Sequence, residues 1–101
     1  MDAATEVQEY EISVDDANTE YSQELSGNVK AIEIQCRDAT NILSAFTAGA
    51  VDTASPPGPY FTVKSGTVYR ITGLNMNKPT LYVAAGSGSK VVEVRVWKKT
   101  P

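Results

Sequence analysis

Two short motifs contain the residue types and approximate spacing of ligand-binding loops. Gly86-Ser-Gly-Ser-Lys90 has the composition of a phosphate-binding loop, but its spacing departs from G-x-x-x-x-G-K-[ST]. A predicted strand follows it, so no helix N-terminus is available to hold a phosphate. Residues 16–27 begin like a calcium loop, Asp-x-Asn-x-Glu, but Tyr21 and Gly27 stand where such loops need Gly and Glu. Neither motif therefore predicts a ligand site.

The chain has no histidine and a single cysteine, Cys36. The lack of histidine removes the commonest general base, the Ser-His and Cys-His nucleophile systems, and imidazole metal ligands. One cysteine forms neither an internal disulfide nor a thiolate cluster, and Cys36 falls on the apolar side of a predicted strand, which indicates a buried, inert thiol. No two carboxylates are marked as an acid and nucleophile pair. We therefore expect a protein that is not an enzyme, with no catalytic residue, cofactor or metal.

Length and composition narrow the class further. The 101 residues, 42% of them hydrophobic, suffice for one domain with one core. The net charge of −3 argues against generic binding to nucleic acid, which demands a basic face. No stretch approaches the roughly 20 apolar residues of a membrane span. The first 25 residues lack the basic and apolar runs of a signal peptide, so we expect synthesis in a cytoplasm.

The elements that must position any functional residue are strands. Apolar and polar residues alternate with period 2 through most of the chain, as in Val92-Glu-Val-Arg-Val96. Ser65-Gly66 also has the form of a two-residue hairpin turn. The pattern predicts an all-β fold, an antiparallel β-sandwich of about eight strands, and leaves open whether the order is jelly-roll or immunoglobulin-like. The predicted strands are 6–14, 19–25, 29–37, 41–47, 59–64, 67–72, 80–84 and 90–98.

Charge divides the chain into an acidic N-terminal segment, 1–28, and a β-sandwich body, 29–101, which together form one domain. Residues 1–25 hold eight acidic residues and no base, a charge of −8, whereas residues 26–101 hold nine basic and four acidic residues, a charge of +5. The segment could lie on the basic face of its own body, or it could be an arm that reaches a neighbouring subunit. Part of it alternates like a strand with one buried face.

Three features are candidates for contact with a partner: the acidic segment, the proline-rich loop at 48–59 and the aromatic residues on polar strand faces. The loop is either a tolerated surface insertion or a semi-rigid contact loop. Tyr60, Tyr82 and Trp97 could anchor a protein partner or stack on a sugar, unless another element covers them. The residues we expect at a partner surface are Glu6, Glu9, Glu11, Pro56, Pro57, Tyr60 and Trp97.

Four segments in order carry a resemblance to a known family: 29–46 (VKAIEIQCRDATNILSAF), 59–66 (PYFTVKSG), 80–84 (TLYVA) and 91–97 (VVEVRVW). This order resembles small structural proteins of tailed bacteriophage virions. In those proteins a strand ending in I-x-I-Q-N precedes a short A-F strand, a Y-F-x-L-K-x-G hairpin, an L-Y-L strand and a closing V-x-V-x-W strand. The resemblance covers roughly residues 29–97, and Cys36 stands where the pattern has Asn.

The resemblance implies a virion component made in the host cytoplasm. It would be a decoration (cement) protein on the capsid exterior, or an accessory protein at the head–tail region. Its partners would be the major capsid protein or neighbouring virion subunits, with self-association into a homo-oligomer such as a trimer, and with neither nucleic acid nor membrane. The alternative is a carbohydrate- or receptor-binding β-sandwich module, which needs Tyr60, Tyr82 or Trp97 coplanar on one open face.

Overall fold

The computed structural model describes residues 6–38, 40–53 and 55–99, and these residues form nine strands and no helix. Residues 1–5 of the acidic segment, and residues 39, 54, 100 and 101 of the body, lie outside the described residues. In the part of the chain that is described, no helix is long and apolar enough to cross a membrane. The strands are β1 (Glu6–Val14), β2 (Tyr21–Glu24), β3 (Asn28–Cys36), β4 (Ile42–Ala45), β5 (Phe61–Val63), β6 (Tyr69–Ile71), β7 (Met76–Asn77), β8 (Thr80–Ala85) and β9 (Lys90–Lys99).

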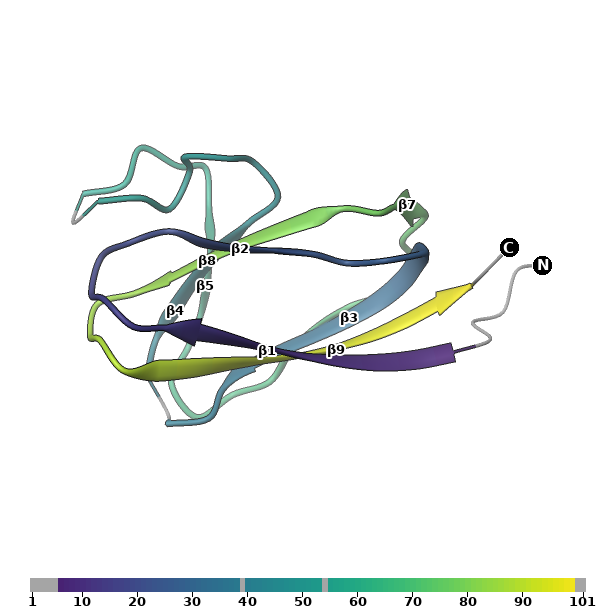
Figure 1. The fold of residues 1–101 in the computed structure, drawn as a ribbon, viewed down its shortest axis with the longest axis horizontal. Coiled ribbons are helices and arrows are strands. Elements are labelled where there is room, and N and C mark those ends of the chain that lie inside the picture. The colour runs from purple at the N-terminus through teal and green to yellow at the C-terminus, as the bar shows by residue number, and fades with distance from the viewer. Residues whose placement is uncertain (1–5, 39, 54, 100–101) are drawn as a thin grey trace.

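The strands form two antiparallel sheets that pack face to face (Figure 1). Sheet A has the order β1-β9-β3-β6, with β7 also paired to β3, and sheet B has the order β2-β8-β4-β5. With the two-residue β7 set aside, the pairs are β1 with β9, β2 with β8, β3 with β6 and β4 with β5. This nested pairing is the topology of a jelly roll. The all-β antiparallel sandwich is therefore confirmed, and the strand order that the sequence left open is resolved.

The core lies between the sheets and is built from the inward side of each alternating strand. Ile32 and Ile34 of β3, and Val92, Val94 and Val96 of β9, are at most 2% exposed. Because β9 and β3 are the central strands of sheet A, each is covered on both edges, and their β-branched side chains fit a half-buried pleated surface. Full burial of one such side chain stabilises the fold by roughly 1.5–3 kcal/mol.

Two details of the strand prediction are wrong, and a third is incomplete. The Ser65-Gly66 turn exists, with the Thr67 amide donating to the Lys64 carbonyl at 3.2 Å, but it does not join hairpin partners. β5 pairs with β4 in sheet B, whereas β6 pairs with β3 in sheet A, so the turn crosses between sheets. The predicted loop before Pro79 contains the short strand β7. In the predicted strand 59–64, alternation with Tyr60 places Phe61 on the buried face, yet its side chain is 51% exposed.

An aromatic stack spans the side of the sandwich between β5 and β6. The ring of Phe61 in β5 lies 4.2 Å from the ring of Tyr69 in β6, centroid to centroid, with 19° between their planes. On the opposite side of the sandwich, β1 and β2 end the two sheets and contact each other. Cys36 packs against the edge of the core and is partly rather than fully buried.

Candidate contact surface

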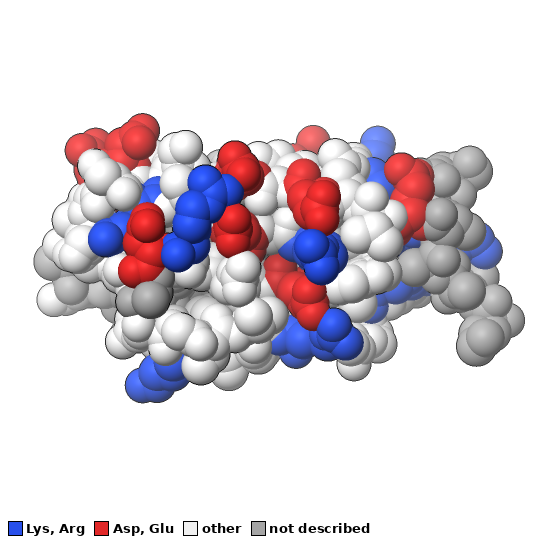
Figure 2. All heavy atoms as spheres, turned by 90° about the horizontal axis from the view of Figure 1, so that it is seen from below, with Lys and Arg blue, Asp and Glu red and all other residues white. Residues whose placement is uncertain are grey.

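The outer face of sheet A collects most of the charged side chains that the strands carry. On β1 the residues that alternate with buried Ile12 point outward, and these include Glu9 and Glu11. On β9 the outward residues are Glu93, Arg95 and Trp97, which alternate with buried valines. Figure 2 shows acidic and basic side chains interleaved across this face. We define this outer face as the candidate contact surface.

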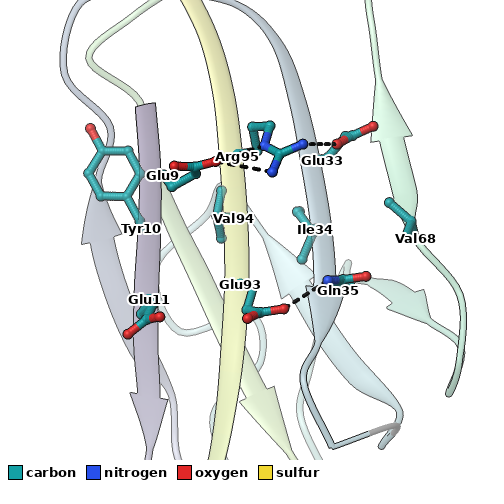
Figure 3. Close-up of a pocket in the computed structure, with 10 residues that line it drawn as sticks. All are labelled: Glu9, Tyr10, Glu11, Glu33, Ile34, Gln35, Val68, Glu93, Val94 and Arg95. Carbon is teal, nitrogen blue, oxygen red and sulfur yellow. Dashed lines mark hydrogen bonds and ion pairs between the residues drawn. The ribbon is translucent and has the colours of Figure 1, made fainter. Parts of the chain in front are cut away.

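One row of alternating charge crosses all four main strands of sheet A. The strand registers set Glu9 opposite Arg95, Arg95 opposite Glu33, and Glu33 opposite Arg70. Arg95 lies between two carboxylates, with Nη2 at 3.0 Å from Glu9 Oε2 and Nη1 at 3.9 Å from Glu33 Oε1 (Figure 3). Arg70 forms an ion pair with Glu33 from the other side. Opposite charges on neighbouring strands stabilise the sheet by roughly 0.2–1 kcal/mol per pair.

A second row places two carboxylates opposite each other, Glu11 on β1 and Glu93 on β9. Arg37, just beyond β3, bridges them: its Nη2 lies 2.5 Å from Glu11 Oε2 and 2.8 Å from Glu93 Oε2. Gln35 donates to Glu93 at 2.8 Å. The hydrogen bonds from Gln35 and then Arg37 lower the pKa of Glu93. The carboxylate therefore stays ionised at neutral pH, which suits it to hold cations and not to donate protons.

An open hollow of about 500 Å³ lies over these two rows (Figure 3). Its polar lining consists of carboxylates, a glutamine and an arginine, and Val68 forms part of its rim. No group of three or more side chains that could ligate a metal occurs among the described residues. The arrangement offers fixed, mostly paired charges to a partner surface.

Trp97 forms the apolar end of the candidate contact surface. The guanidinium of Arg70 lies 5.4 Å from the ring centroid, a cation–π contact. Beside the ring, a hollow of about 330 Å³ is lined by Lys30, Ala31, Arg70 and Trp97. Val7, opposite Trp97 on β1, is 53% exposed. Tryptophan and arginine are the residue types enriched at the hot spots of protein interfaces.

The structure brings together Glu9, Glu11 and Trp97 of the residues expected at a partner surface, and it separates the others. Glu6 shares the alternation of Ile12, so it points to the opposite face of β1, at its N-terminal end. The described part of the acidic segment lies against its own body, because β1 pairs with β9 along its whole length.

The proline-rich loop lies away from this face, beside sheet B (Figure 1). Pro57 and Tyr60 are exposed there, and Pro56 is half-buried. Tyr82 alternates with buried residues of β8, so it faces outward from sheet B, whereas Trp97 faces outward from sheet A. The two aromatic side chains therefore lie on opposite faces, and they do not form one sugar-stacking platform.

Glu20 holds the proline-rich loop in place. Its carboxylate accepts hydrogen bonds from the backbone amides of Gly49 at 3.0 Å and Val51 at 3.3 Å. In return Asp52 Oδ1 accepts the Glu20 amide at 3.2 Å. Val51 is fully buried, and Ala84 is buried although it faces outward from sheet B, which indicates that the loop packs on this sheet. The carboxylate that the sequence placed in a calcium-like motif thus anchors a loop.

A buried lysine joins the start of β1 to the turn before β3. Lys98 is 5% exposed, and its ammonium donates to Gln8 Oε1 at 2.5 Å and to Ser26 Oγ at 2.6 Å. The Tyr10 hydroxyl accepts the Ser26 amide at 3.1 Å in the same network. Gln8 and Ser26 thus accept hydrogen bonds from the Lys98 ammonium, whose charge would otherwise be costly to bury.

The sequence analysis did not identify the arginines of this surface. Arg37, Arg70 and Arg95 each pair with a glutamate on another strand, and these pairings depend on register between segments up to 86 positions apart. The available signal was the charge at polar positions of strands that the alternation already predicted.

Comparison with protein-family models, with curated proteins and with solved structures gives no significant match.

Proposed function

We propose that this chain is a non-enzymatic structural protein of a bacteriophage virion, most specifically a decoration (cement) protein that binds the capsid exterior. It would act through protein–protein contacts alone. The observation that carries the proposal is the candidate contact surface, where a rigid sheet fixes Glu9, Glu11 and Trp97 in register with paired arginines.

A surface of this kind suits a repeated contact with a protein lattice. Strand pairing fixes the backbone positions of these charges, and complementary charges set register and partner choice more than raw affinity. Trp97 and the neighbouring Val7 add an apolar anchor beside the charged rows. Each contact can be weak, because a shell that binds many copies gains stability by mass action and multivalency.

The topology also supports this proposal, by analogy. Jelly rolls recur in viral capsid domains, but also in lectins and cupins, so the fold alone does not define a function. In the sugar-binding alternative, Trp97 and Tyr82 could not share one stacking platform, since these residues face outward from opposite sheets.

The test is localisation on particles. Virions from the source of the sequence are purified on a gradient, labelled with an antibody raised against the purified chain, and the copy number is measured by quantitative mass spectrometry. A regular, high copy number on the head supports a decoration protein. Label confined to the neck would move the assignment to a head–tail accessory protein, and absence from purified particles would overturn the virion role.

A further inference from the structure

The two open sides of the sandwich carry opposite charge. β1 and β2 end the two sheets on one side, and every charged residue from position 6 to 25 is acidic. β5 and β6 end the sheets on the other side, and the charged residues from position 61 to 71, Lys64 and Arg70, are basic. We call these the β1–β2 side and the β5–β6 side. Glu9 and Glu24 are exposed on the first, and Lys64 and Arg70 are exposed on the second.

The charged row across sheet A is incomplete at both ends. Its inner members, Arg95 and Glu33, each contact two partners of opposite charge. Its end members each contact one among the described residues: Glu9 contacts Arg95, and Arg70 contacts Glu33. The Glu9 side chain is 66% exposed and that of Arg70 is 59% exposed. The row thus begins with an exposed carboxylate and ends with an exposed guanidinium, which also lies over the Trp97 ring.

We propose that the β5–β6 side of one copy docks on the β1–β2 side of a second copy, with Arg70 opposite Glu9. Because the four strands of sheet A alternate in direction, β6 of one copy lies antiparallel to β1 of the next when the sheet continues. The charged row then runs on from copy to copy without interruption. The same register sets Tyr69 beside Tyr10, an aromatic pair on the inner face.

Exposed apolar residues strengthen this choice of partner. Phe61 is 51% exposed and Val68 is 55% exposed, and both lie on or next to the β5–β6 side. Val7 supplies an exposed apolar residue on β1. A neighbouring copy would cover part of this apolar surface, whereas a monomer leaves it in water.

Pairing of like sides is disfavoured by the same charges. An antiparallel pair of two β1 strands centred on Tyr10 would set Glu9 of one copy against Glu11 of the other, and like charges directly opposite destabilise a sheet. The contact is therefore head-to-tail. Such contacts generate rings when the rotation closes and open chains when it does not. The inference rests on the proposed function only in that a decoration protein must bind in many copies, and its test needs no virion.

The test measures self-association of the purified full chain by sedimentation velocity across a concentration series at low and high salt. The informative variants are Glu9→Lys and Arg70→Glu, each of which sets like charges across the contact. We expect each to lower the association constant by about two- to thirtyfold, since each replaces an attractive cross-strand pair by a repulsive one. An equimolar mixture of the two variants should associate again, because Lys at position 9 of one chain then meets Glu at position 70 of the other.

The controls separate this contact from an effect of net charge. Asp38→Lys and Lys78→Glu make the same changes in charge at exposed turns outside both sides, and they should leave association unchanged. If circular dichroism shows that Arg70→Glu unfolds the chain, Arg70→Gln takes its place. This variant brings no like charge near Glu33, and it should lower the association constant less. The inference is overturned by a wild-type chain that stays monomeric, by reversals that act no more strongly than the controls, or by a mixture that fails to associate. Absence from virions would leave self-association standing and would refute the proposed function alone.

Discussion

Replacing Gly88 by alanine should destabilise the fold, because this glycine lies against the backbone where β1 ends. A Cβ added at Gly88 would lie 2.6 Å from the Asp15 carbonyl oxygen, 0.4 Å inside the 3.0 Å limit that real Cβ atoms keep. That oxygen cannot withdraw freely, since it accepts the Ser89 amide at 3.1 Å and follows directly on the paired strand β1. Forcing one extra carbon into a packed site costs about 1–3 kcal/mol.

The matched control stands two residues away in the same turn. A Cβ at Gly86 meets no atom within 4 Å, and Gly86 has no positive φ. Gly86→Ala should therefore be neutral, or stabilising by about 0.4–1 kcal/mol through a less flexible unfolded chain. For a domain of this size, each kcal/mol shifts Tm by about 4–8 °C.

Thermal and urea unfolding of both variants, followed by circular dichroism and Trp97 fluorescence, measure the difference. We expect Gly88→Ala to unfold at a clearly lower temperature and urea concentration than Gly86→Ala. Equal stability of the two variants would contradict the close contact between the β8–β9 turn and the end of β1.

Two further predictions concern the charged surface and the β5–β6 side of the sandwich. Gln35 and Arg37 lower the pKa of Glu93, so its contribution to stability is present at neutral pH and is lost as the pH falls below about 4.3. The difference in unfolding free energy between the wild type and Glu93→Gln should therefore shrink between pH 7 and pH 3, and a difference independent of pH would contradict this. Phe61→Ala removes the stack on Tyr69 and should lower the unfolding free energy by about 0.5–1.5 kcal/mol in urea titrations, and an unchanged midpoint would mean that the stack does not stabilise the fold.

The strands could be predicted from the sequence, but which strand pairs with which could not. Alternation is a local signal, and it located β1 and β9 to within a residue at each end. The Ser65-Gly66 turn has hairpin chemistry, yet the strand that follows it joins β3, because Ile71 pairs with Ile32 in the other sheet. Turn residues fix the local path of the backbone, and the partner of an edge strand depends on burial between segments far apart.

The contact surface was predictable to a similar extent. Alternation places Glu9 and Glu11 on one face of their strand and Trp97 on the polar face of its own. That the three share one face follows only from the register of β1 on β9, which sets Val7 opposite Trp97. The arginine opposite each glutamate depends on the same register, so no local pattern identifies it.

The anchoring of the proline-rich loop by Glu20 has a consequence for the dissociation rate of any complex that this loop forms. A segment whose shape is set before the encounter gives up little freedom on docking, and so avoids an ordering cost of about 0.5–1.5 kcal/mol for each side chain immobilised. Removal of the Glu20 carboxylate should leave the association rate nearly unchanged and shorten the lifetime of any complex in which Pro57 and Tyr60 take part.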